Sequence, residues 1–177
     1  MNKNKILILA VIVVIVLLAA SRLVKHPFNF TPITAMAIFA GFYLKKYWGL
    51  VIPLAATAVS DYFLGFYDWQ VMISVYVGFA IAYFLGWLLS RHKKWYNIFI
   101  ASAASSLIFF IITNFSVWAF FNWYPHTWAG FISCFTLALP FFRNGFVGDF
   151  IYTGLLFGLF EAAIFLVEKR ATKFSEA

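Results

Sequence analysis

The 177 residues are 64% hydrophobic and 23% aromatic, only 11% are charged, and the mean hydropathy is +0.91. A water-soluble domain of this length needs far more polar surface, so the composition excludes a soluble globular protein. The net charge of +7 does not indicate nucleic acid, because the basic residues fall between apolar runs, as membrane topology requires. A single cysteine, Cys134, excludes an intramolecular disulfide and a multi-cysteine metal site.

The first apolar run covers about residues 5–24 and follows two lysines. A charged start, the apolar stretch and Ala19-Ala20-Ser21 are also the parts of a cleavable signal peptide. The run approaches membrane-spanning length and many apolar runs follow it, which favours a retained first transmembrane helix.

Five further runs predict transmembrane helices at about 32–46, 48–66, 69–90, 96–121 and 144–168. The piece at 129–141 would be only ~20 Å long as a helix, too short to cross ~30 Å of hydrocarbon. We therefore expect a short re-entrant or interfacial helix there. Before the second run, Thr31 is a candidate helix cap and Pro32 suits the first helical position. The prediction is an all-α, six-span polytopic membrane bundle forming one domain, residues 1–177.

The basic residues predict the orientation of this bundle. With the N-terminus inside the cell, most of them are cytoplasmic: Lys3, Lys5, Lys45, Lys46, Arg91, Lys93, Lys94, Lys169, Arg170 and Lys173. Only Arg22, Lys25 and Arg143 then lie outside. Because positive charge favours the cytoplasmic side, we expect both termini in the cytoplasm of a multi-pass protein of the inner (cytoplasmic) membrane, embedded in the lipid bilayer.

Under this topology, unusual polar residues collect at the outer end of the bundle. Charged groups at membrane depth are costly, so they usually face a partner, a cavity or a substrate. Arg143 and Asp149 also lie where a helix is expected to begin, and the free amides there favour anions. We expect an outward-facing pocket between the second, third, fifth and sixth spans, in which Trp118 and Tyr152 stack on a ring of the substrate. The predicted substrate-binding residues are Asn29, Thr31, Asp61, Asn114, Trp118, His126, Arg143, Asn144, Asp149 and Tyr152.

Purely structural roles compete with this interpretation. Arg143 would form a buried ion pair with Asp149 or Asp61, and Asn144 would cap the last helix. Asn114 would make an interhelical hydrogen bond, and His126 would be an interfacial loop residue. Glu161, ~10 Å inside the cytoplasmic end of the last span, would reach toward Lys45 or Lys46 or bind a cytoplasmic partner.

Small residues at four-residue spacing predict faces that turn toward other helices. Such faces occur in the third, second and last spans: Gly49, Pro53, Thr57 and Asp61; Ala37 and Gly41; Gly154, Gly158 and Ala162.

The sequence lacks the HExxH, G-x-S-x-G, Walker and dinucleotide-binding signatures, so we expect no enzyme activity. Asp61, Asp149, His126 and Arg143 nevertheless leave a membrane enzyme as one alternative. A non-catalytic membrane assembly factor is the other. Any active transport would need another subunit or an ion gradient.

Ordered motifs resemble an uncharacterised bacterial family of small integral membrane proteins. They are Asn29-Phe-Thr-Pro-Ile33, Ser60-Asp-Tyr-Phe-Leu-Gly65, Thr113-Asn-Phe-Ser-Val-Trp118, Tyr124-Pro-His-Thr-Trp-Ala-Gly130 and Leu139-Pro-Phe-Phe-Arg-Asn-Gly-Phe-Val-Gly-Asp149. That family is similar in size and layout to the substrate-binding S components of energy-coupling-factor (ECF) vitamin transporters.

The resemblance implies uptake of a vitamin or similar small nutrient, with an ECF-type energising module as partner. The alanine-x-x-x-alanine docking pattern of S components is missing from residues 5–24, and Ala37 with Gly41 is a substitute in the second span. We expect no resident cofactor and no metal. A corrinoid-binding relative with a cysteine ligand makes corrinoid binding at Cys134 a further candidate.

Overall fold

The computed structural model of the chain describes residues 3–25, 29–44, 47–91 and 94–175. These residues form six helices and no strand: α1 (Lys3–Ser21), α2 (Ile33–Tyr43), α3 (Trp48–Leu64), α4 (Trp69–Leu89), α5 (Trp95–Phe120) and α6 (Trp128–Ser175). The predicted all-helical class is confirmed, and each of the first five predicted spans corresponds to one helix.

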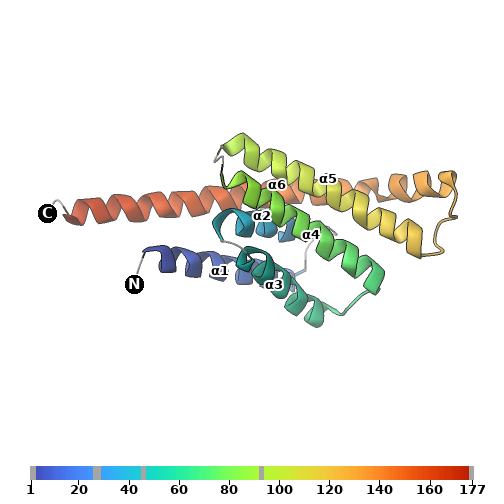
Figure 1. The fold of residues 1–177 in the computed structure, drawn as a ribbon, viewed down its shortest axis with the longest axis horizontal. Helices are drawn as coiled ribbons and strands as arrows, with labels where there is room; N and C mark the ends of the chain where they lie inside the picture. Colours follow the sequence, from blue (N-terminus) through green and yellow to red (C-terminus); the bar gives the residue numbers. More distant parts are fainter. Residues whose placement is uncertain (1–2, 26–28, 45–46, 92–93, 176–177) are drawn as a thin grey trace.

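Consecutive helices run in alternating directions (Figure 1). The start of α1 and the end of α6 therefore lie at the same end of the molecule, and the turn between α5 and α6 lies at the opposite end. We call the latter the α5–α6 end; the segments 22–25, 65–68 and 121–127 all face it. The core residues Val11 and Ile15 of α1 are fully buried, so this first helix is an integral part of the bundle.

The short helix α2 is the centre of the fold. Residues 33–41 are all buried, and α2 contacts each of the other five helices. The predicted small pair Ala37 and Gly41 explains part of this, since a Cβ added at Gly41 would lie 2.2 Å from the backbone oxygen of Tyr83 in α4. Because Ala37 and Gly41 are buried inside the bundle, the expectation that they dock an energising subunit is wrong.

Three helical segments are long and apolar enough to cross a membrane: α4, α5 and residues 128–167 of α6. The apolar parts of α1, α2 and α3 are shorter. With 11 residues, α2 is only about 16 Å long, so neighbouring helices must enclose its ends. The six-span count therefore stays a prediction, while a helical bundle with membrane-spanning segments agrees with the composition.

Helix α6 corrects the prediction at residues 129–144. The expected re-entrant piece at 129–141 and the expected span at 144–168 are one continuous helix of 48 residues that passes through Pro140. Proline removes one backbone hydrogen bond from a helix, and the helix nevertheless continues on both sides of Pro140. Arg143 and Asn144 thus lie in the middle of a helix, so the predicted anion-binding helix start and the Asn144 cap do not exist.

Two smaller predictions also differ. Pro32, rather than Thr31, occupies the cap position of α2, and no side chain caps that end. A Cβ at Gly158 would meet nothing within 4 Å, and one at Gly154 would only touch Phe99 at 3.6 Å, so the predicted close packing of this pair does not occur. The expected face of α3 is confirmed: Gly49, Pro53, Thr57 and Asp61 are all buried.

Candidate functional site

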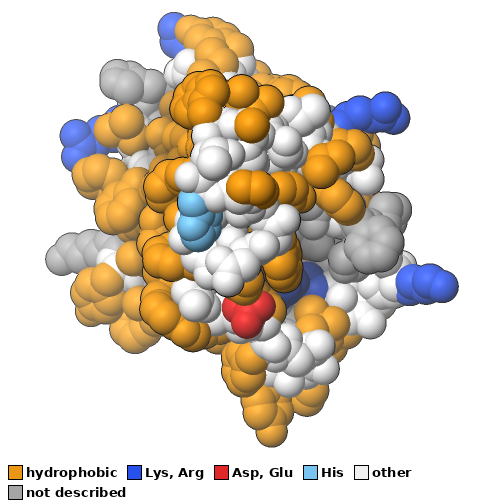
Figure 2. Space-filling view, turned by 90° about the vertical axis from the view of Figure 1, so that its right-hand side faces the viewer, with side chains coloured by type: hydrophobic (Ala, Val, Ile, Leu, Met, Phe, Trp, Pro, Cys, Tyr) orange, Lys and Arg blue, Asp and Glu red, His pale blue; other side chains and the backbone are white. Residues whose placement is uncertain are grey.

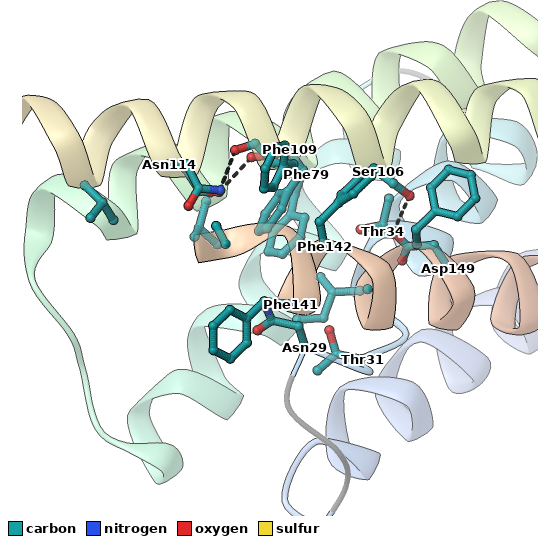
Figure 3. A pocket seen from close by; sticks show the side chains of 18 of the residues that line it. Asn29, Thr31, Thr34, Phe79, Ser106, Phe109, Asn114, Phe141, Phe142 and Asp149 are labelled. Carbon is teal, nitrogen blue, oxygen red and sulfur yellow. Dashed lines mark hydrogen bonds between the residues drawn. The ribbon is translucent and has the colours of Figure 1, made fainter. Parts of the chain in front are cut away.

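A cavity of about 350 Å³ lies between α2, α4, α5 and α6. Its volume is typical of a small-molecule site. Six phenylalanines and Tyr67 form much of its wall, and the remaining lining includes hydroxyl, amide, guanidinium and carboxyl groups (Figure 3). The lining residues outside the helices come from the α1–α2 and α3–α4 segments: Arg22, Asn29, Thr31 and Tyr67.

Two matching stripes of side chains on α5 and α6 form the long walls. On α5 the stripe runs from Ser106 to Val117, and on α6 from Ala138 to Asp149. Within each stripe the lining residues recur at three- and four-residue spacing, which keeps them on one helix face. Because α5 and α6 are antiparallel, Ser106 lies beside Asp149, and the cavity extends ~16 Å along the helices toward the α5–α6 end.

Asp149 is the polar group at the inner end of the cavity and is only 5% exposed. Its Oδ2 atom lies 2.6 Å from Ser106 Oγ of α5. Thr34, at the start of α2, supplies a second hydroxyl beside the same carboxyl group (Figure 3). Behind this group, Thr153 Oγ1 donates to Ser102 Oγ at 3.2 Å, so a layer of buried hydroxyls joins α5 to α6.

Arg22 lines the cavity from the segment after α1 and is held by α3. Its guanidinium forms an ion pair with Asp61 at 2.7 Å and also contacts the Ser60 hydroxyl. Tyr76 of α4 donates to the second carboxylate oxygen of Asp61 at 2.9 Å. Each carboxylate oxygen of Asp61 therefore has a structural partner, whereas Nε of Arg22 is buried and has no hydrogen-bond partner among the described residues.

Tyr67 lines the same part of the cavity from the α3–α4 segment. Burial raises the pKa of Tyr67 to about 12, with a further increase from the Asp61 carboxylate and a smaller opposing effect of Arg22. The phenol therefore stays protonated at neutral pH and is a hydrogen-bond donor for a bound molecule.

Four of the predicted site residues line the cavity: Asn29, Thr31, Asn114 and Asp149. Asn29 has φ of 59°, a left-handed conformation that asparagine tolerates better than most residues. Asn114 donates to the carbonyl of Phe110 at 2.8 Å. Asp61 is next to the cavity but reaches it only through Arg22.

The other predicted residues lie elsewhere. Trp118 donates to the Pro125 carbonyl at 3.1 Å and packs edge-on against His126, so both belong to the α5–α6 turn. Tyr152 packs against Phe30 instead of facing the cavity. Asn144 is half-buried on α6 outside the lining.

Arg143 is exposed and lies on α6 about 120° around the helix from Asp149, because six residues separate them. Helical geometry therefore keeps the two side chains apart. Asp61 pairs with Arg22 and Asp149 with hydroxyl groups, so the predicted ion pair of Arg143 with either aspartate is replaced by these contacts. The predicted pocket is also shifted, since α4 takes the place expected for α3.

The sequence-based interpretation missed Arg22, Thr34 and Ser106. A signal existed for Ser106: Ser102 and Ser106 precede Phe110 and Asn114 at four-residue spacing along an uncharged helix. Arg22 carried no such signal, because one arginine after an apolar run usually marks a membrane boundary.

Figure 2 looks onto the α5–α6 end of the molecule. Lysine and arginine side chains project mostly at the outline of this view, and a partly hidden basic side chain lies beside an acidic one nearer the centre. Hydrophobic side chains form much of the remaining surface, as the composition requires.

A second, smaller cavity of about 180 Å³ lies toward the opposite end. Glu161 and the fully buried Phe157 line it, and the Tyr43 hydroxyl donates to Glu161. The expected partners Lys45 and Lys46 of Glu161 lie outside the described residues.

Cys134, the candidate corrinoid ligand, is 2% exposed and its Sγ lies 3.6 Å from the Asn114 carbonyl. It does not line the main cavity. Within the described part of the chain, no three His, Cys, Asp or Glu side chains are grouped closely enough to hold a metal ion.

Residues 2–173 match the family described as "Family of unknown function (DUF6580)". The chain belongs to this family. The expected membership of an uncharacterised family is thereby confirmed, and the further likeness to ECF S components stays a prediction. No curated protein and no solved structure matches the chain.

Proposed function

We propose that this DUF6580 protein is an S-component-like membrane uptake protein that binds a vitamin-like small nutrient in the cavity between α2, α4, α5 and α6. The observation that carries the proposal is the cavity itself, about 350 Å³, aromatic-walled, with the buried Asp149 at its inner end. Concave sites that combine aromatic walls with convergent polar groups are typical of small-molecule binding.

The arrangement of side chains favours binding over catalysis. A nucleophile or general base needs a partner within hydrogen-bond distance of the reacting group. His126 lies in the α5–α6 turn, and Asp61 is bound by Arg22 and Tyr76, so neither is available beside Asp149. A membrane enzyme is therefore the weaker alternative. An assembly factor does not require a cavity with a buried acid at its inner end, so the cavity also favours binding of a small molecule over that alternative.

The proposed topology has six passes with both termini in the cytoplasm and the cavity open toward the outer side. The alternating helix directions support it, since Arg91, Lys94 and Lys169 then share the cytoplasmic end (Figure 1). The energising ECF-type module would have to dock on a surface other than Ala37 and Gly41.

Mass spectrometry of small molecules that co-purify with the detergent-extracted protein tests the function. Gly145 lines the cavity, and a leucine there would project into the space that a ligand needs. We expect wild-type protein to carry a defined small molecule that Gly145→Leu lacks. Gly158→Leu is the matched control, because this glycine on the same helix has open space around it.

Both variants must elute as monodisperse folded protein with unchanged helical circular dichroism. A ligand retained in Gly145→Leu places binding elsewhere and refutes the cavity as the site. A stoichiometric protein in place of a small molecule supports the assembly factor, and a bound metal with substrate turnover supports the enzyme.

A further inference from the structure

Asp149 is a buried acid with no cationic partner in the described structure. Helices α2, α4 and α5, which pack around it, contain no Lys, Arg, Asp or Glu. Of the other charged groups nearby, Arg22 is paired with Asp61, and Arg143 is exposed on another face of α6. Tyr67 lines the cavity, whereas Tyr76 is bound to Asp61 and Tyr152 packs on Phe30. A lone carboxylate in such a place is costly, so its charge needs a bound proton or a bound cation.

The hydrogen bonds around Ser106 accommodate a proton on Asp149. Ser106 Oγ lies 2.9 Å from the Ser102 carbonyl and 2.6 Å from Asp149 Oδ2, and both groups accept hydrogen bonds when the acid is ionised. A hydroxyl has one proton and can donate to only one of them. If Asp149 is protonated, it donates to Ser106, and Ser106 donates to Ser102, so every group is satisfied. The geometry fits a neutral Asp149.

The wall of the cavity is suited to replacing that proton by an organic cation. Phe79, Phe109, Phe142 and Phe146 line the same cavity as Asp149, and aromatic faces attract cations. Arg22 does not oppose this, because the Asp61 carboxylate neutralises it. An anionic ligand would instead meet the Asp149 carboxyl group, and Arg22, the cation that lines the cavity, already has Asp61 as its counterion.

We propose that the ligand of this cavity is an organic cation, a protonated amine or a cationic ring nitrogen, whose positive charge displaces the proton of Asp149. The O–H bond of the acid breaks, the proton leaves to solvent, and an ion pair with the ligand forms in its place. This inference rests on the proposed function and adds to it the chemical class of the nutrient and a coupling of binding to proton release.

Benzylamine, benzyl alcohol and benzoate are probes of the same shape with positive, neutral and negative charge. Binding to the purified full-length protein is measured by ligand-observed NMR. We expect benzylammonium to bind in preference to the other two. Its affinity should rise between about pH 5.5 and about pH 7.5, by up to about tenfold per pH unit, because one proton is released on binding.

Asp149→Asn should abolish both the preference for the amine and the pH dependence. The substitution keeps the size and a neutral hydrogen-bonding group, so the fold is retained. Asp68→Asn is the control, because this exposed aspartate outside the cavity undergoes the same chemical change. The control should behave as wild type.

If benzyl alcohol or benzoate binds as tightly as benzylammonium or more tightly, the proposal of an organic cation is overturned. The cavity would still be a small-molecule site, so this outcome does not affect the proposed uptake role. An amine preference that persists in Asp149→Asn would overturn the role of Asp149. Absence of binding by all three probes would also overturn it, and the co-purification experiment would then decide the uptake role separately.

Discussion

Arg22 and Asp61 form a buried ion pair that ties the segment after α1 to α3 and α4. The side chains are 13% and 2% exposed, and Tyr76 and Ser60 complete the hydrogen bonding. Breaking a buried pair on one side leaves an uncompensated charge, which is more damaging than removing both partners. The pair therefore positions Arg22 at the cavity. The hydrogen bonds to Tyr76 and Ser60 offset the free-energy cost of removing the two charges from water.

Asp61→Asn should destabilise the protein by about 3–5 kcal/mol, because the Arg22 charge stays buried without a counterion. The loss is measured as a shift of the unfolding midpoint in detergent. Asp68→Asn should change stability little, since that aspartate is exposed. Combining Arg22→Met with Asp61→Leu should recover much of the loss, and equal destabilisation by the single and double variants would contradict the ion-pair interpretation.

At the scale of elements, the contact between α2 and α4 depends on glycine. A Cβ at Gly86 would lie 2.2 Å from the carbonyl oxygen of Ile38, a distance that no side chain can relieve because backbone atoms meet there. Gly41 makes the reciprocal close approach to the backbone of α4. These two glycines let a short, fully enclosed helix lie at the centre of the bundle and hold Thr34 beside Asp149.

Gly86→Ala should therefore separate α2 from α4 and cost about 1–3 kcal/mol or more, as overpacking does in other cores. Gly154→Ala is the comparison, because its added Cβ would only reach an ordinary 3.6 Å contact with Phe99. Thermal unfolding of both variants in the same detergent checks the difference. A Gly86→Ala protein as stable as Gly154→Ala would refute the tight α2–α4 contact.

At the scale of the whole molecule, α6 is far longer than one membrane crossing. Its 48 residues extend about 72 Å, against ~30 Å of hydrocarbon. Part of α6 must lie outside the hydrocarbon or at a steep tilt, and Figure 1 shows its C-terminal part extending beyond the other helices. In the proposed topology, α6 crosses the membrane once, and its two ends lie on opposite sides.

Single cysteines introduced in a Cys134→Ala background test this topology. His126→Cys in the α5–α6 turn should react with a membrane-impermeant maleimide in intact cells. Arg91→Cys and Lys169→Cys, both exposed at the opposite end, should react only after lysis. Labelling of position 91 or 169 in intact cells would reverse the orientation or change the number of crossings.

Sequence alone determined the class of this protein and the approximate positions of its first five helices. Apolar runs of the right length have few alternatives in a chain with 11% charge, so the first five predicted spans each correspond to a helix. The four-residue spacing along α3 correctly identified its buried face, because helical geometry is local. The topology argument grouped Asn29, Thr31, Asn114 and Asp149, which line the cavity, with six other residues that do not.

Only the tertiary structure decided how these residues are paired. Partners such as Arg22 with Asp61, or Ser106 with Asp149, are 39 and 43 residues apart, and no periodicity within one helix records which helices are neighbours. Helix α6 continues through Pro140 although proline removes one backbone hydrogen bond. Whether the neighbouring turns and packing compensate for that loss cannot be read from the proline residue alone. That continuity turns Arg143 away from Asp149, because the angle between two helix positions is fixed once the helix is unbroken.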